Sequence, residues 1–135
     1  MPYNFDFEIK HQYPDHEPGI TIPIFLTYGS KTEKVLAKLD TGADFCVFTY
    51  DLALLLGVPL TSGPKKTFDT SGGLVETYGH EVTIKSFDFE HTAFVYFAST
   101  LGHRRNLLGR QGWIRNFQIG LTDYENVLYL SPYSR

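Results

Sequence analysis

The pattern of apolar and polar residues predicts strands over most of the chain. A half-buried strand turns every second side chain toward the core, so strict alternation is its signal. Such alternation, with apolar residues at every second position, is found in residues 3–9, 20–26, 35–39, 82–84 and 93–97. These runs are rich in Ile, Val, Phe and Tyr, which favour pleated structure.

Turn residues separate these runs and predict how they connect. Gly29 and Ser30 lie in a predicted hairpin turn, and two further hairpins are expected around residues 71–73 and 86–88. Residues 11–19 contain two prolines and a glycine and are expected to form a loop. Pro23 lies inside a strand pattern, which indicates an edge position or a bulge.

One segment, residues 49–59, has the features of a helix. Thr49 or Asp51 can cap its start, leucines fill its middle, and Gly57 followed by Pro59 ends it. A second, shorter helical turn is expected at residues 111–114. Residues 65–98 as a whole read as strands joined by those two hairpins, and the remaining strands or short apolar runs are 45–48, 107–109, 117–121 and 127–130. Together the elements predict an all-β, mostly antiparallel single domain over residues 1–135, a closed barrel with one or two short helices.

Composition narrows the possible partners. The formal net charge is -3 and the Lys-Arg clusters are short, so we expect no nucleic-acid partner. The single cysteine, Cys46, excludes an intrachain disulfide and is expected to be a buried small hydrophobe. No signal-peptide core or membrane-length apolar stretch is found, so the expectation is a cytoplasmic protein without a membrane partner.

The first candidate for chemistry is Asp40-Thr41-Gly42-Ala43, which follows an apolar strand. Gly42 allows close approach of its backbone, and its N–H can donate to the carboxylate. Thr41 offers a hydroxyl to a neighbouring loop, and Ala43 keeps the adjacent wall small. The alternative is an ordinary Asp-Gly turn between two strands.

A second motif, Leu107-Leu108-Gly109-Arg110, favours a catalytic loop over an ordinary turn at Asp40. Together the two motifs resemble the retropepsin family, the single-domain aspartic proteases of retroviruses and their bacterial relatives. The resemblance covers residues 20–130 in the family's order. It implies a retropepsin-like closed barrel with a flap hairpin and aspartic endopeptidase activity.

The resemblance also implies roles for individual residues. The catalytic loop would be Asp40, Thr41 and Gly42, with Asp40 as the catalytic carboxylate and Thr41 bracing the site from the partner's loop. Ala43 and Asp44 would contact substrate, and Asp44 would pair with Arg110, which together with Gly109 supports the loop. No metal or cofactor is implied.

A second aspartate is needed, and Asp69 is the internal candidate. It lacks a glycine directly after Asp-Thr, polar residues precede it, and it lies too close to Asp40 in sequence for a second lobe. By the resemblance its hairpin is the flap, about residues 66–80, with Ser71, Gly72 and Gly73 at the substrate-binding tip.

The remaining source of a second carboxylate is another copy of the chain. A C2 homodimer would bring Asp40 beside its own copy, with a peptide or protein substrate extended between flaps and floor. Two such carboxylates share one proton and activate a water. Ala43 offers them no hydroxyl, which predicts an acidic to near-neutral optimum. The polar, turn-prone end of the chain argues against fully interleaved C-terminal strands.

Other residues carry weaker signals. The five histidines show no metal-ligand spacing, and Trp113 is expected to pack the short C-terminal helix onto the barrel. The rival to the enzyme is a non-catalytic peptide-binding or dimerisation module with the same fold. A third possibility is a peptidase domain that works only when excised from, or assembled with, a larger partner.

Overall fold

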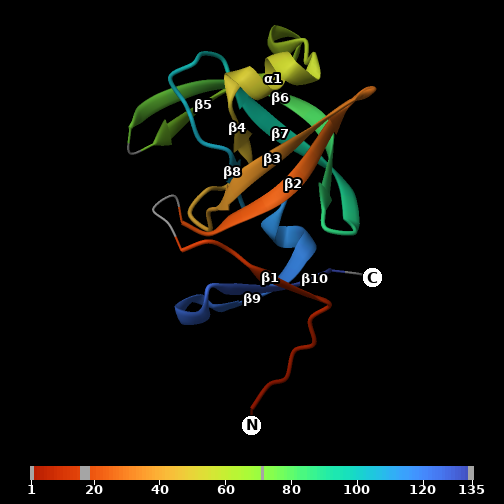
Figure 1. The fold of residues 1–135 in the computed structure, drawn as a ribbon. Helices are drawn as coiled ribbons and strands as arrows, with labels where there is room; N and C mark the ends of the chain where they lie inside the picture. Colours follow the sequence, from red (N-terminus) through yellow and green to blue (C-terminus); the bar gives the residue numbers. More distant parts are fainter. Residues whose placement is uncertain (1, 16–18, 71, 134–135) are drawn as a thin grey trace.

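A seven-stranded sheet, six of whose strands close into a ring, forms the body of the protein (Figure 1). The computed structural model describes residues 2–15, 19–70 and 72–133. The seven strands are β2 (Thr21–Tyr28), β3 (Lys31–Leu39), β4 (Val47–Phe48), β5 (Lys65–Thr70), β6 (Gly73–Ser86), β7 (Phe89–Ala98) and β8 (Leu107–Leu108). Their order is β2-β3-β8-β4-β7-β6-β5. A further pairing of β2 with β6 closes the first six into a ring, and β5 is attached outside it through β6. The predicted all-β closed barrel is therefore confirmed.

The closing pair explains how a proline is accommodated in β2. Phe25, Leu26 and Thr27 pair with β6, whereas Pro23 lies ahead of that stretch and faces only Leu36 of β3. Proline has no N–H to donate, so a position paired on one side costs no ladder hydrogen bond. The edge position predicted for Pro23 is confirmed.

Alternation along the strands builds the core. In β3, Val35, Ala37 and Leu39 are buried while Lys34 and Leu36 are exposed. In the β6–β7 hairpin, Val82 lies opposite Ala93, so both point into the same core. The period-two runs of the sequence therefore correspond to the inward faces of barrel strands.

Helix α1 (Tyr50–Leu56) and the turn after it cover one end of the barrel, and the C-terminal 3-10 helices lie at the other end beside the second sheet (Figure 1). In α1, the Thr49 hydroxyl accepts a hydrogen bond from the Leu52 N–H at 3.3 Å, and Gly57 ends the helix at a φ of 72°. Thr49, rather than Asp51, is thus the N-cap. Three 3-10 helices follow: η1 (Leu60–Ser62), η2 (Ile114–Asn116) and η3 (Asp123–Glu125).

The helical turn expected at residues 111–114 is displaced toward the C-terminus. Gly112 has a φ of 103°, in the region that favours glycine, and helical geometry is reached only at Ile114. Trp113, just before η2, is fully buried, and its ring packs at a tilt of 44° against Phe117 with a centroid distance of 4.5 Å. Its predicted role in packing this segment onto the barrel is confirmed.

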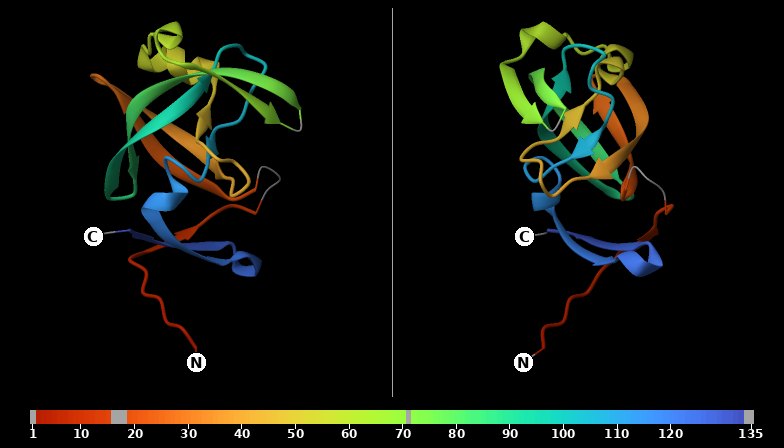
Figure 2. Two further views of the ribbon diagram at one scale, coloured as in Figure 1. Left: turned by 180° about the vertical axis from the view of Figure 1, so that it is seen from behind. Right: turned by 90° about the vertical axis from the view of Figure 1, so that its left-hand side faces the viewer.

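A second sheet, which the sequence did not indicate as separate, lies below the barrel (Figure 2). Its order is β1-β10-β9, with β1 (Ile9–Gln12), β10 (Val127–Pro132) and β9 (Phe117–Thr122) all antiparallel. Leu128 and Leu130 of β10 join the main core. The sheet therefore extends the barrel's core downward instead of forming a core of its own.

The first predicted strand begins later than its alternation indicates. Tyr3 and Phe5 are exposed, at 89% and 65%, and β1 starts only at Ile9, taking in two residues expected to be loop. Ile9 pairs with Leu130, so continuing the register would bring Phe7 opposite Pro132, which has no N–H. The Ser131 hydroxyl closes the ladder there by accepting from the Glu8 N–H at 2.8 Å.

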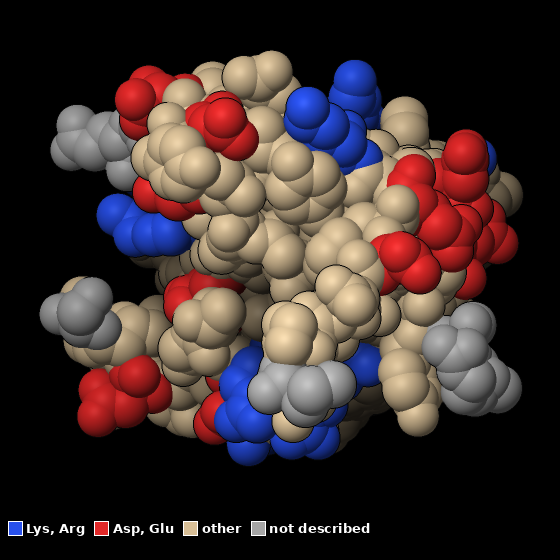
Figure 3. Space-filling view, turned by 90° about the horizontal axis from the view of Figure 1, so that it is seen from below, with Lys and Arg blue, Asp and Glu red and all other residues tan. Residues whose placement is uncertain are grey.

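Charged side chains on the lower face gather in separate patches (Figure 3). Uncharged residues fill much of the centre, and the Lys and Arg groups in view do not join into one continuous stripe. No helix in the described part of the chain is long and apolar enough to cross a membrane.

One buried hydrogen bond ties the β6–β7 hairpin to the segment before η2. The Trp113 indole N–H donates to the Ser86 hydroxyl at 2.9 Å, and both residues are fully buried.

Ser86→Ala leaves the indole N–H buried without a partner, so the free energy of unfolding should fall by about 1–3 kcal/mol. Urea unfolding measures this loss. Ser30→Ala, in an exposed turn, is the control and should change stability by less than about 0.5 kcal/mol; equal effects of both variants would contradict the assignment.

Candidate active site

Asp40 follows β3 at the point where the chain leaves the barrel. β3 runs parallel to β8, with Leu39 opposite Leu108, and the Asp40 N–H donates to the Leu108 carbonyl at 3.0 Å. The neighbouring Leu39 N–H donates to the Ile20 carbonyl at 2.8 Å. The backbone under the carboxylate is therefore held from two sides.

The loop after Asp40 orients its carboxylate. The Gly42 N–H donates to Asp40 Oδ1 at 3.0 Å, and the Ala43 N–H donates to the Asp40 carbonyl at 3.1 Å. Asp40 is half-buried, while Thr41 and Gly42 are exposed. Within the described residues, Oδ2 of Asp40 and the Thr41 hydroxyl have no hydrogen-bond partner. One carboxylate oxygen is thus fixed, and the other is open to a ligand.

Gly109 allows the two signature segments to touch through their backbones. A Cβ at this position would lie 2.3 Å from the Phe45 carbonyl oxygen and 2.8 Å from that of Ala43. The Arg110 N–H donates to the Ala43 carbonyl at 2.9 Å, and the Gln111 N–H to the Asp44 carbonyl at 2.8 Å. The supporting role expected of Gly109 has a direct physical basis, since only glycine permits this approach.

The ion pair expected between Asp44 and Arg110 is not formed within the chain. Both side chains are exposed, and the one ion pair among the described residues joins Lys65 to Glu76. The two residues support the loop through their backbones instead. The Arg110 N–H donates to the Ala43 carbonyl, and the Asp44 carbonyl accepts from the Gln111 N–H. An exposed pair would add little in any case, because solvent screens it.

The β5–β6 hairpin carries the residues expected at the substrate-binding tip. Thr70 pairs with Gly73, and its hydroxyl accepts from the Gly72 N–H at 3.2 Å and donates to the Gly73 carbonyl at 2.7 Å. Gly73 has a φ of 110°. Ser71, also expected at the tip, lies outside the described residues. The end of this hairpin and the loop after β3 are on the same side of the barrel in both views (Figures 1 and 2).

Asp69 has a different setting from Asp40. It lies in β5 opposite Leu74 and is exposed, and none of the described residues donates a hydrogen bond to its carboxylate. The sequence indicated that Asp69 is a poor match to the Asp40 motif, and the local structure of the two aspartates differs in the same sense.

An aromatic cluster, which the sequence did not reveal, joins the hairpin to the Asp40 loop. Phe68 of β5 lies 6.0 Å from Phe45 and 5.3 Å from Tyr96 of β7, and Phe45 lies 5.2 Å from Tyr96, all measured between ring centroids. The Lys66 ammonium lies over both phenylalanine rings, at 5.2 and 5.5 Å. These contacts hold the base of the hairpin against the segment that follows Asp44.

The residues expected to be structural have structural contacts. Cys46 is fully buried, and burial raises the pKa of its thiol to about 12. His11, His80 and His91 each hydrogen-bond a backbone carbonyl, at 3.0, 2.7 and 2.8 Å. No group of three or more His, Cys, Asp or Glu in the described part of the chain is arranged to hold a metal ion.

Comparison with known proteins identifies the family. A family model described as aspartyl protease matches residues 27–112, which include the Asp40 loop, the β5–β6 hairpin and Gly109. The chain belongs to the aspartyl protease family. No curated protein matches the sequence.

A solved aspartyl protease shares the fold. The structure of EIAV protease complexed with the inhibitor HBY-793 aligns with a TM-score of 0.53 and 28% sequence identity. The alignment covers 73% of this chain and 88% of that protease. The retropepsin-like fold, inferred in the sequence from two short motifs, is thereby confirmed.

The backbone contact at Gly109 can be tested directly. Gly109→Ala should lower the free energy of unfolding by about 1–3 kcal/mol, because its Cβ overlaps the backbone carbonyls of Phe45 and Ala43 and the two segments must shift apart. Gly102→Ala is the control, since its Cβ would meet only the Thr100 hydroxyl at 3.7 Å. Thermal and urea unfolding compare the two variants. A Gly109→Ala protein as stable as Gly102→Ala would show that the two segments are not held in this way.

Proposed function

We propose that this protein is an aspartic endopeptidase that works as a homodimer, with Asp40 from each copy forming the catalytic pair. The observation that carries the proposal is the Asp40 loop itself. A carboxylate fixed through one oxygen by the Gly42 N–H and open at the other is suited to hold a water or a second carboxyl group.

A second copy is needed because one chain carries a single aspartate in the Asp-Thr-Gly setting. Asp40 is the one aspartate set in an Asp-Thr-Gly sequence, and Asp69 lies in a hairpin strand instead. Thr41 is exposed beside Asp40 and uses its hydroxyl for no contact among the described residues. In a two-fold dimer that hydroxyl would bind the partner's loop and brace the pair.

The chemistry then follows from two carboxyl groups that share one proton. The ionised Asp40 takes a proton from a water held between them, and the resulting hydroxide forms a bond to the scissile carbonyl carbon. The protonated Asp40 of the other copy donates to the carbonyl oxygen. As the tetrahedral intermediate collapses, a proton passes to the amide nitrogen, the C–N bond breaks, and the shared proton is restored.

The β5–β6 hairpin would serve as the flap over an extended peptide. Its glycine-containing turn lies on the side of the barrel where the Asp40 loop emerges (Figure 1). A peptide between hairpin and loop can add main-chain hydrogen bonds as an extra strand does. Gly72 and Gly73 of the tip, with Ala43 and Asp44 of the loop, are the proposed substrate contacts.

The proposal predicts that Asp40→Asn abolishes cleavage while the fold is kept. An amide cannot take the water's proton, so kcat/KM should fall at least about a thousandfold in a peptide-library assay between pH 3 and 7. Asp69→Asn is the matched control and should keep activity within about threefold of the parent chain.

Two outcomes would contradict this prediction. Cleavage that survives Asp40→Asn would assign the chemistry to other residues. Absence of Asp40-dependent cleavage by the unmodified chain at every pH tested would favour the non-catalytic binding module.

A further inference from the structure

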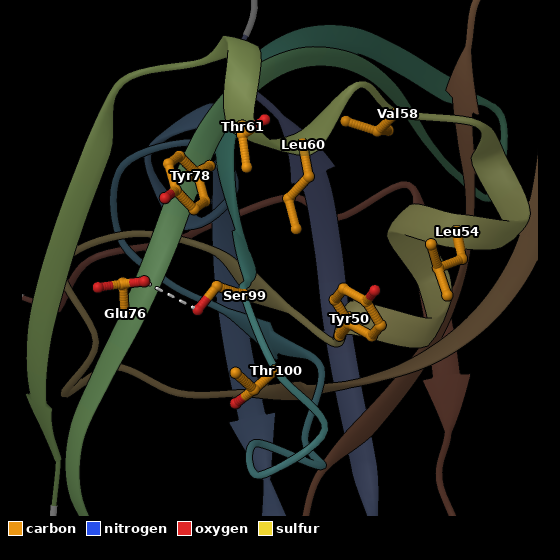
Figure 4. Close-up of a pocket in the computed structure, with 9 residues that line it drawn as sticks. All are labelled: Tyr50, Leu54, Val58, Leu60, Thr61, Glu76, Tyr78, Ser99 and Thr100. Carbon is orange, nitrogen blue, oxygen red and sulfur yellow. Dashed lines mark hydrogen bonds between the residues drawn. The ribbon is translucent and has the colours of Figure 1, made fainter.

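A cavity on the outer side of the barrel is separate from the Asp40 loop. It has a volume of about 480 Å³ and lies between α1, η1, β6 and the turn after β7 (Figure 4). None of residues 40–44 lines it. Its size falls in the range of small-ligand sites, roughly 300–1,000 Å³.

The walls of the cavity combine aromatic, aliphatic and hydroxyl groups. Tyr50 and Leu54 come from α1, Leu60 from η1, and Tyr78 from β6. Figure 4 shows Tyr50 and Leu60 directed toward the space across from Ser99. Polar and apolar surface contribute nearly equally to the wall. Such a wall can cover an apolar group and bond a polar one at the same time.

Glu76 is the one charged residue among those that line the cavity. Its carboxylate is held from two sides: Oε2 lies 2.8 Å from Lys65 Nζ, and Oε1 accepts from the Ser99 hydroxyl at 3.3 Å (Figure 4). The Ser99 N–H also donates to the Glu76 carbonyl at 2.9 Å, which fixes the backbone beneath the side chain. The Lys65 hydrogen bond lowers the pKa of Glu76, so the carboxylate is ionised at neutral pH.

The Glu76 carboxylate, the tyrosine rings and the aliphatic side chains together favour one chemical class of ligand. A carboxylate repels anions and attracts ammonium or guanidinium groups, and the faces of tyrosine rings favour cations as well. The aliphatic side chains need an apolar body to cover them. We propose that the cavity binds a primary ammonium or guanidinium group carried on an apolar body, with Glu76 as its counter-ion and Tyr50 and Tyr78 as its aromatic walls.

The existing ion pair makes Lys65 a competitor for the same carboxylate. Lys65 lies opposite Tyr78 in the β5–β6 pairing, so its ammonium approaches Glu76 from the neighbouring strand. A cationic ligand must displace or share that contact. Removing the lysine ammonium should therefore strengthen binding, whereas removing the carboxylate charge should weaken it.

The test uses the full chain with Asp40→Asn, which removes any cleavage without altering the cavity. The probe is 2-phenylethylammonium, and the neutral control is 2-phenylethanol, which has the same ring and chain length. Binding is followed by the backbone amide signals of Thr61, Tyr78 and Ser99. We expect saturable shifts at these residues and an affinity at least about tenfold higher for the ammonium than for the alcohol.

Three variants connect the binding to Glu76. Glu76→Gln should weaken ammonium binding by about tenfold or more, and Lys65→Met should strengthen it severalfold. Glu81→Gln is the matched control, because Glu81 is exposed on the same strand and does not line the cavity; its affinity should equal that of the parent. Glu76→Gln and Lys65→Met break the same ion pair, so opposite effects on binding cannot come from lost stability.

The results that overturn the proposal are equally distinct. Equal affinities for the ammonium and the alcohol, an unchanged affinity in Glu76→Gln, or shifts confined to residues 40–44 would each do so.

A second arm with the capped dipeptide Ac-Leu-Arg-NH2 separates the two sources of such a cation. Tighter binding of the dipeptide would indicate a basic side chain of a protein, and tighter binding of 2-phenylethylammonium a free amine. The binding test uses the inactive Asp40→Asn chain, so a negative result would say nothing against the proposed catalysis. A negative cleavage assay would likewise say nothing against binding in the cavity.

Discussion

The structure depends above all on the close backbone contact between the segment after Asp40 and the segment that begins at Gly109. A Cβ at Gly109 would lie 2.3 Å from the Phe45 carbonyl oxygen, so the contact exists only because residue 109 is glycine. Through it the loop gains two inter-segment hydrogen bonds, from the N–H groups of Arg110 and Gln111. The carboxylate of Asp40 is consequently positioned by backbone geometry, with no contribution from a buried charge.

Local sequence was sufficient where one element decides its own structure. Thr49 and Gly57 marked the ends of α1 because capping depends on a few neighbouring residues. Alternation identified the inward faces of β3, β6 and β7, since burial on one side of a strand imposes period two. The two short motifs indicated the aspartyl protease family because close packing at Gly109 restricts both segments at once.

The sequence was insufficient where the outcome depends on a distant partner. Phe7 fits a strand pattern, but its position in the register would face Pro132, which lies at the other end of the chain. Asp44 and Arg110 have complementary charges, yet their side chains remain in solvent while their backbones make the contacts. Phe45 and Phe68 are brought together by barrel closure, and no spacing rule relates their positions. The cavity beside Glu76 arises in the same way, from four elements that meet only in the folded chain.

The central claim is that Asp40 acts only opposite its own copy, and mixing two kinds of chain tests it most directly. Asp40→Asn chains are mixed with unmodified chains at constant total concentration, allowed to exchange, and assayed for peptide cleavage. If each active unit needs two intact carboxylates, activity follows the square of the unmodified fraction, so an equal mixture retains about a quarter of the full activity. Activity that falls in simple proportion to the unmodified fraction would contradict the account, because each chain would then act alone.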